Sequence, residues 1–237
     1  KYLVEKKIIK LTQKTVVNGP YKSLKLNCNT HWAGFDFSSK LIGMYERQVQ
    51  DKIINLREKF NLENMINFGC GDGYHLIGSI KNNDFKLGLA FEIDERSLEY
   101  MKDNIKLNDL GEKIKVFKKA NFEDVNKLLN KDQLKKTIYL VDIEGEEFDL
   151  FNQKNLTYFK DSILLIENHH FLKDKNIVKN FFEFMKNYFD LEIIKNGPRN
   201  PHELSLLDTF DDDEKWLIMS EGRKQSMEWL VFIPKQI

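Results

Sequence analysis

Short apolar segments alternate with amphipathic segments along most of this chain. Seven apolar runs have the length and composition of buried strands, at residues 65–68, 86–93, 114–120, 137–143, 162–167, 191–195 and 227–234. Several segments between them, such as 94–107 and 176–188, carry apolar residues at helical spacing. Such alternation is typical of an open parallel sheet covered on both faces. No clear helix separates the last two runs, so we predict an α/β fold with a seven-stranded, mostly parallel sheet, helices on both faces and an antiparallel last strand.

Residues 1–60 precede this alternation and form a predicted N-terminal extension. Residues 38–60 carry an apolar stripe that predicts one helix, whereas residues 1–37 show no clear period. The main domain is then predicted to cover residues 61–237. It contains an irregular insertion at 197–226, in which we interpret the acidic run 211–214 as a solvated loop.

An aromatic cluster of Trp32, Phe35 and Phe37 surrounds Gly34 in the extension. Aromatic side chains most often pack into a core. A glycine hinge beside them also suits a lid over a bound ligand, so both interpretations stay open.

Composition and charge narrow the class of protein. The 237 residues include 37 basic and 37 acidic side chains, and this balance lacks the positive charge of a general nucleic-acid binder. Two cysteines, Cys28 and Cys70, are too few for a disulfide framework or a zinc site. No apolar run approaches the length of a membrane span, and the charged start is unlike a signal peptide. We therefore expect a cytoplasmic protein without nucleic-acid or membrane partners, whose oligomeric state the sequence leaves open.

The first predicted strand runs into a glycine-rich turn, with Gly69, Gly71 and Gly73 at alternate positions. Glycines leave the backbone bare, so a ligand can lie against it. The helix that follows presents free N–H groups and the positive end of its dipole to that ligand. Small size is the simplest reason for Cys70 within this turn.

Polar residues follow the other predicted strands, and they would meet the turn at the edge where open α/β sheets bind ligands. They include Glu92, Asn121, Asp142, Glu144, Glu167, Asn168, His169 and His170. At the end of the second strand, the carboxylate of Glu92 can accept both hydroxyls of a ribose. The third glycine comes one residue too early for the dinucleotide fingerprint, and no Gly-Lys-Ser/Thr phosphate loop is present. S-adenosylmethionine, a nucleoside cofactor without pyrophosphate, fits these features.

These segments resemble class I S-adenosylmethionine-dependent methyltransferases, which have a Rossmann-like fold, and more narrowly the FkbM-type family. The resemblance rests on residues 90–94, 104–108 and 164–169, and above all on residues 142–147, which match the family's Asp-x-Glu-Gly-x-Glu signature. It spans roughly residues 41–170. Two positions depart from it: Asn67 replaces the acid usual in class I enzymes, and Ile93 replaces a frequent proline of the family.

The resemblance implies a set of residues that contact the cofactor. They are Gly69, Gly71 and Gly73 at the methionine end, Glu92 at the ribose, Asn121 and Phe122 at the adenine, Asp142 near the methionine or the acceptor, and Asn67, Cys70 and Ile93 beside them. An amide at position 67 should hold the amino group of the cofactor less strongly than an acid would. The implied reaction is O-methylation of a hydroxyl on a small molecule, such as a sugar or a polyketide. Class I enzymes often place substrate-binding structure where residues 197–226 lie.

Transfer of a methyl group to a hydroxyl gains from a base that removes the hydroxyl proton. We hypothesise that His169 is this base, because it follows a strand end that faces the crevice and has a near-neutral reference pKa. Asp142 or Glu144 would orient the imidazole or the acceptor. The simpler alternative is that His169 and His170 are ordinary loop histidines.

Three other functions are compatible with parts of the sequence. Catechol-type O-methyltransferases hold Mg²⁺ with acids and an Asn at these strand ends. The corresponding residues here are Asp142, Glu167 and Asn168. Our favoured interpretation needs no metal. Amino-directed nucleic-acid methyltransferases carry an Asn/Asp-Pro-Pro-aromatic segment after the fourth strand, which this chain lacks. A protein that binds the cofactor without catalysis is the third alternative.

Overall fold

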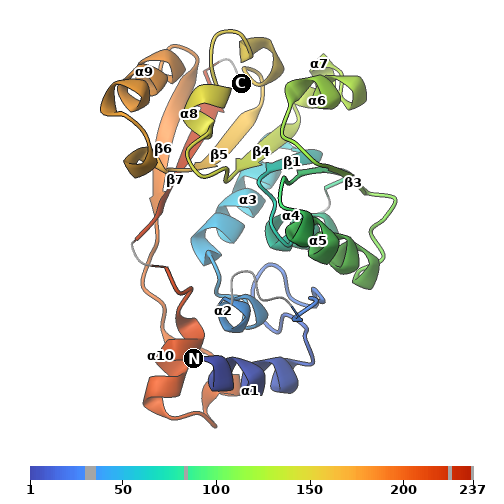
Figure 1. Cartoon of the computed structure of the whole chain (residues 1–237), viewed down its shortest axis with the longest axis vertical. Helices are drawn as coiled ribbons and strands as arrows, with labels where there is room; N and C mark the ends of the chain where they lie inside the picture. The colour runs from blue at the N-terminus through green and yellow to red at the C-terminus, as the bar shows by residue number, and fades with distance from the viewer. Residues whose placement is uncertain (30–35, 83–84, 224–225, 236–237) are drawn as a thin grey trace.

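A seven-stranded sheet forms one end of the molecule, and three short helices lie at the other (Figure 1). The computed structural model describes residues 1–29, 36–82, 85–223 and 226–235. The strand order is β3-β2-β1-β4-β5-β7-β6. The strands are β1 (Asn64–Phe68), β2 (Leu87–Phe91), β3 (Ile114–Phe117), β4 (Thr137–Val141), β5 (Ile163–Glu167), β6 (Phe189–Lys195) and β7 (Glu228–Pro234).

The predicted direction of the strands is confirmed. β3, β2, β1, β4 and β5 are parallel neighbours, and β7 lies antiparallel between β5 and β6. β6 is antiparallel to β7 and therefore parallel to β5, so β5 and β6 end at the same edge of the sheet, and the chain re-enters the sheet from that end. A return from that end makes β7 antiparallel to β5.

Helices cover both faces of the sheet, as predicted. They are α3 (Arg47–Phe60), α4 (Tyr74–Asn82), α5 (Glu95–Leu107), α6 (Phe122–Leu128), α7 (Lys131–Leu134), α8 (Glu147–Leu150) and α9 (Lys175–Met185). Successive residues of a strand point to opposite faces, so Met65 joins one core and Ile66 the other. Of these helices, α3, α4 and α5 contribute residues to the first core, and α6, α7, α8 and α9 contribute residues to the second. Among the described residues, no helix is both long and apolar enough to cross a membrane.

The single helix predicted over residues 38–60 is wrong, because the segment folds as two helices, α2 (Phe37–Leu41) and α3. Gly43, with φ of +71°, breaks the helix between them. A Cβ atom at Gly43 would lie 2.0 Å from the carbonyl oxygen of Asn18, so the close contact of two backbones requires glycine here. The apolar stripe continues across the break because Ile42 and Tyr45 still pack against the same core.

Two helices that the sequence pattern did not predict, α1 (Tyr2–Thr12) and α10 (Asp212–Met219), pack together at the far end from the sheet (Figure 1). Both also contact α2. The acidic run 211–214 is therefore the start of a helix and not a loop, since the Asp211 side chain accepts a hydrogen bond of 2.8 Å from the Glu214 N–H. The N-terminal extension and the insertion, which are distant in sequence, thus form one structural unit.

Part of the aromatic cluster, for which both a lid and core packing were considered, lies outside the described residues. These residues are Trp32, Gly34 and Phe35. Phe37, the remaining member, is buried at the start of α2.

Residues 13–29 attach the extension to α4 through Tyr21. This side chain is fully buried, and its hydroxyl lies 3.0 Å from the Ser79 Oγ and 3.3 Å from the His75 Nδ1. The ring of Tyr21 packs directly on Gly78, where an added Cβ atom would come within 2.4 Å of the ring carbon Cγ.

We expect the Gly78→Ala variant to be less stable than wild type, although alanine favours a helix by about 1 kcal/mol over glycine. Overpacking against a rigid buried ring costs about 1–3 kcal/mol, which leaves a net loss of up to about 2 kcal/mol. The free energy of unfolding in urea measures it. Gly111→Ala is the matched control, since no atom lies within 4 Å of a Cβ there. A Gly78→Ala protein as stable as the control would contradict the proposed contact.

Candidate active site

The register of the parallel strands brings several predicted site residues together. The last residue of β1 pairs with the last residues of β2 and β4, so Gly69, Glu92 and Asp142 leave the sheet side by side. All three line a single cavity of about 1410 Å³, and Glu167 at the end of β5 lines it too. Typical small-molecule pockets occupy roughly 300–1,000 Å³. The cavity therefore has room for a cofactor and a second molecule.

The three glycines of the turn have different environments, although all have positive φ. A Cβ atom on Gly69 would collide with the Asp142 carbonyl oxygen, whereas one on Gly71 would meet no atom within 4 Å. Gly71 thus exposes bare backbone to the cavity. Gly73 is not part of the cavity lining, and its missing Cβ makes room for Ile77 and Met101 where α4 and α5 pack.

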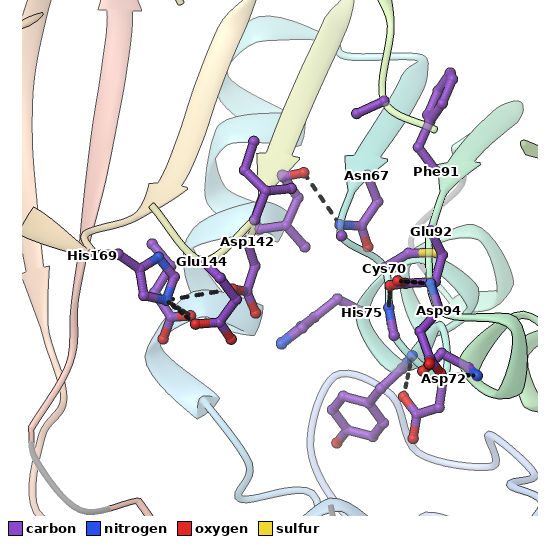
Figure 2. A pocket seen from close by; sticks show the side chains of 18 of the residues that line it. Asn67, Cys70, Asp72, His75, Phe91, Glu92, Asp94, Asp142, Glu144 and His169 are labelled. Carbon is purple, nitrogen blue, oxygen red and sulfur yellow. Dashed lines mark hydrogen bonds and ion pairs between the residues drawn. The ribbon is translucent and has the colours of Figure 1, made fainter. Parts of the chain in front are cut away.

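The Glu92 carboxylate holds the glycine turn in place. Its Oε2 accepts a hydrogen bond of 2.8 Å from the Gly71 N–H, and its Oε1 accepts one of 2.9 Å from the Asp94 N–H. Each carboxylate oxygen keeps a second lone pair. The side chain lies at the cavity wall (Figure 2), so it can accept two more hydrogen bonds from a ligand.

Only one of the residues predicted beside the ribose and adenine, Ile93, joins Glu92 in the cavity lining. Ile93 lines the cavity and is 78% exposed, which leaves an apolar surface free beside Glu92. Asn121 and Phe122 are not in the lining. Asn121 instead caps α6 by accepting a hydrogen bond from the Asp124 N–H, and Phe122 is buried in the core. Lys119, just before them, reaches the cavity in their place.

Asn67 and Cys70 both line the cavity, but each is engaged with the protein. The Asn67 Nδ2 donates a hydrogen bond of 3.2 Å to the Leu140 carbonyl oxygen (Figure 2). Burial, with the nearby Glu92 charge, raises the pKa of the Cys70 thiol well above its usual value. Cys70 is therefore a small uncharged wall residue and not a reactive thiolate.

His169 is surrounded by carboxylates at the side of the cavity away from the glycine turn (Figure 2). Its Nε2 lies 3.3 Å from Glu167 Oε2, 3.6 Å from Glu144 Oε2 and 3.7 Å from Asp142 Oδ1. Its Nδ1 lies 3.2 Å from Glu147 Oε1. The imidazole is almost completely buried, whereas the Glu144 side chain is 78% exposed.

The charges around His169 determine its protonation. Burial alone would lower the pKa of His169, but hydrogen bonds to Glu147 and Glu167 and the charge of Asp142 raise it to about 10. The imidazole is then protonated at neutral pH and has no free nitrogen to act as the base that we hypothesised. Burial and the charge of Glu167 raise the pKa of Asp142 well above its usual value. Burial alone would also raise the pKa of Glu167, but His169 and Arg223 outweigh burial and lower this pKa to about 2.

Glu147 is a site residue whose role the sequence analysis did not assign. It is the last acid of the Asp-x-Glu-Gly-x-Glu signature, which was the available signal. Its Oε1 also accepts a hydrogen bond from the His169 N–H, and its Oε2 accepts one of 2.9 Å from the Gly145 N–H. Glu147 thereby fixes both the imidazole and the loop that carries Glu144.

Arg223 is a second site residue that was not predicted, and unlike Glu147 it has no signal in the sequence. It donates hydrogen bonds to Glu167, Glu46 and Glu221, whose side chains are all nearly inaccessible to solvent. Glu167 and Glu46 lie 56 and 177 positions away in the chain. No local pattern could reveal such a contact. Arg223 joins the insertion to the end of β5 and to the residue before α3.

The magnesium site considered for a catechol-type enzyme is not assembled. The Asn168 Nδ2 donates to Glu228 Oε1 at 2.7 Å, and its Oδ1 accepts from the His170 N–H, so this side chain is held outside the cavity lining. His169 takes its place next to Asp142. Asp142, Glu144 and His169 each offer a donor atom, and these atoms lie within 4.8 Å of one another.

Solved structures show which fold this chain shares. A precorrin-6y methyltransferase from Geobacter metallireducens superposes with a TM-score of 0.51 at 11% identity, over 80% of this chain and 90% of that one. A presumed O-methyltransferase from Klebsiella pneumoniae also gives 0.51, at 10% identity, over 97% of this chain and 89% of that one. A presumed tRNA methyltransferase from Streptococcus pneumoniae, in complex with S-adenosyl-L-methionine, gives 0.49 at 15% identity, over 78% and 73%.

The chain therefore has the Rossmann-like fold of class I S-adenosylmethionine-dependent methyltransferases. No family model matches the sequence, and neither does any curated protein. The narrower resemblance to the FkbM-type family stays a prediction.

We expect the Arg223→Gln variant to lose about 3–5 kcal/mol of stability, because three buried carboxylates lose the cation that they share. The free energy of unfolding at pH 7 measures the loss. Arg47→Gln removes the same charge from an ion pair with the half-exposed Asp51, and it should cost at most about 1 kcal/mol. Similar losses in the two variants would show that Arg223 is not the centre of a buried network.

Proposed function

We propose that this protein transfers a methyl group from S-adenosylmethionine to a hydroxyl of a small molecule or a saccharide. The observation that carries this proposal is the position of the Glu92 carboxylate. It lies beside the open backbone of Gly71, in the same cavity as the charged groups around His169. One side of the cavity suits a nucleoside, and the other carries polar groups that can hold an acceptor.

The residues on the first side fit S-adenosylmethionine. Gly71 leaves the space that a side chain would fill, and Glu92 has free lone pairs for the ribose hydroxyls. Ile93 offers an exposed apolar surface for the adenine, with Lys119 also in the lining. The bound cofactor would supply an electrophilic methyl group on a sulfonium, and its positive charge suits the carboxylates of this cavity.

The residues on the second side would orient the acceptor. Much of the acceleration of a methyl transfer can come from alignment of the two reactants. A protonated His169 would hold the Glu144 carboxylate beside it, and this carboxylate can accept a hydrogen bond from the hydroxyl of the acceptor. Glu144 is the most exposed carboxylate beside the imidazole, and we assign to it the removal of the hydroxyl proton in place of His169.

The charge of the cavity supports a small acceptor over a nucleic acid. Among the described residues, eleven acidic side chains and only three Lys or Arg side chains line it. A phosphodiester chain would be repelled by such a lining. Aromatic residues such as Tyr45, Phe171 and Trp229 also line the cavity and can cover the apolar parts of a small molecule.

We expect calorimetry to show S-adenosylmethionine binding to the wild-type protein, and about 10–100-fold weaker binding to the Glu92→Gln variant, because hydrogen bonds to a charged group contribute roughly 1.5–3 kcal/mol. Glu95→Gln, an exposed residue on α5 outside the cavity lining, is the control and should bind as wild type does. Equal affinities in both variants would contradict a ribose contact by Glu92.

Methyl transfer itself is tested with S-adenosylmethionine carrying a labelled methyl group and a panel of hydroxylated small molecules, amines and RNA. We expect label in alkali-stable methyl ethers of hydroxyl acceptors. Label found only in amines or RNA would contradict the proposed acceptor. Cofactor binding without transfer to any member would favour a protein that binds the cofactor without catalysis.

A further inference from the structure

The donor atoms that face one another beside His169 have the spacing of a metal coordination sphere. In proteins, zinc–nitrogen and zinc–oxygen bonds are about 2.0–2.2 Å long, so two ligands of one ion lie roughly 3–4 Å apart. The His169 Nε2 lies 3.3–3.7 Å from the nearest oxygens of Glu167, Glu144 and Asp142. Three side chains from the ends of β4 and β5 thus converge on the same imidazole nitrogen.

The other side of the imidazole is arranged as metal-binding histidines usually are. Such a histidine commonly donates its second ring N–H to a carboxylate, which fixes the ring and its tautomer. Here the Nδ1 faces the Glu147 Oε1 at 3.2 Å, and only 1% of the Glu147 side chain is exposed. Because Glu147 also accepts hydrogen bonds from two backbone N–H groups, its position is fixed independently of His169's Nε2.

A separate observation concerns Asp142. Its Oδ1 is buried and has no hydrogen-bond donor among the described residues. Buried oxygens of this kind are rare, and each calls for a partner such as a water molecule or an ion. The oxygen lies 3.7 Å from His169 Nε2 (Figure 2), on the side where Glu144 also points.

We propose that Asp142, Glu144 and His169 bind one divalent first-row transition-metal ion, with Glu167 next to the ion and Glu147 orienting the imidazole. One nitrogen with two or three carboxylate oxygens is a borderline donor set, which favours Mn²⁺, Fe²⁺ or Zn²⁺ over Mg²⁺ and Ca²⁺. Arg223 donates to the Glu167 Oε1, so the Oε2 is the oxygen left for the ion.

The role of the ion, unlike the site itself, rests on the proposed function. A bound ion supplies Lewis-acid chemistry that lowers the pKa of a coordinated hydroxyl. On metal binding His169 would lose the proton on its Nε2 and Glu144 would be a ligand, and the ion would activate the acceptor in place of a protein base. The site lies across the cavity from the glycine turn (Figure 2), so a hydroxyl held at the ion would face the cofactor.

The test uses the full chain, stripped with EDTA and dialysed, and the binding of Mn²⁺ alone measured by electron paramagnetic resonance of the free ion. We expect one site per chain, and at least 10-fold weaker binding to the Glu144→Gln variant. Glu146→Gln is the matched control. Glu146 lies two residues from Glu144 and carries the same charge, but its carboxylate pairs with Lys173. It should bind as wild type does.

Two results would overturn the metal site. The first is that wild type binds no Mn²⁺ at millimolar concentration. The second is that Glu144→Gln and Glu146→Gln weaken Mn²⁺ binding equally, because the ion would then be attracted only by the overall negative charge of the cavity. His169→Gln, checked for folding by its unfolding transition, should also bind at least 10-fold more weakly, and unchanged Mn²⁺ binding would contradict the assignment. S-adenosylmethionine binding to the metal-free protein is measured in parallel. Cofactor binding without Mn²⁺ binding defeats only this inference, whereas Mn²⁺ binding without cofactor binding defeats only the proposed function.

Discussion

At Gly69 the end of β1 lies so close to the end of β4 that a Cβ atom would come within 1.7 Å of the Asp142 carbonyl oxygen. The two groups of site residues depend on this approach. The glycine turn follows β1, and the Asp142 loop follows β4, so the contact places the proposed cofactor side and the proposed acceptor side on opposite walls of one cavity. Any side chain at position 69 would force the two strand ends apart, and the site would lose its geometry even if the sheet survived.

Three sets of charged groups in the cavity differ in their ion-pair partners. Lys40 lies 2.8 Å from both Asp36 and Asp72, and burial alone would lower the pKa of Lys40, but these two carboxylates raise it well above its usual value. Arg223 pairs with its three buried carboxylates in the same manner. Asp142 and Glu144 differ, because among the described residues their ion-pair partner is His169 and not a Lys or Arg. Part of the excess negative charge of the cavity therefore lies where the metal site is proposed.

The parts of this structure that could be predicted from sequence are those that depend on local patterns. Buried parallel strands are continuous apolar runs, and a polar residue directly after one must emerge at the edge of the sheet, which is why Glu92 and Asp142 were placed correctly at the strand ends. The position of Asn121 could not be predicted in the same way, because its side chain caps α6 and the chain turns away from the cavity after Ala120. The break at Gly43 and the pairing of Arg223 with Glu46 depend on contacts between distant segments, and no periodicity records them.

Eight of the 35 described residues that line the cavity lie outside the family resemblance. Asp36 and Lys40 come from the N-terminal extension and α2, and Glu221 and Arg223 come from the insertion before β7. α1 and α10 hold these segments together, so the extension and the insertion act as one wall over the strand ends. The fold shared with known methyltransferases fixes the strand ends that carry the glycine turn and Asp142, but it does not specify the segments that cover them. Residues outside both the fold and the signature motif, such as Asp36 and Arg223, therefore also shape the space that a second molecule would occupy beside the cofactor.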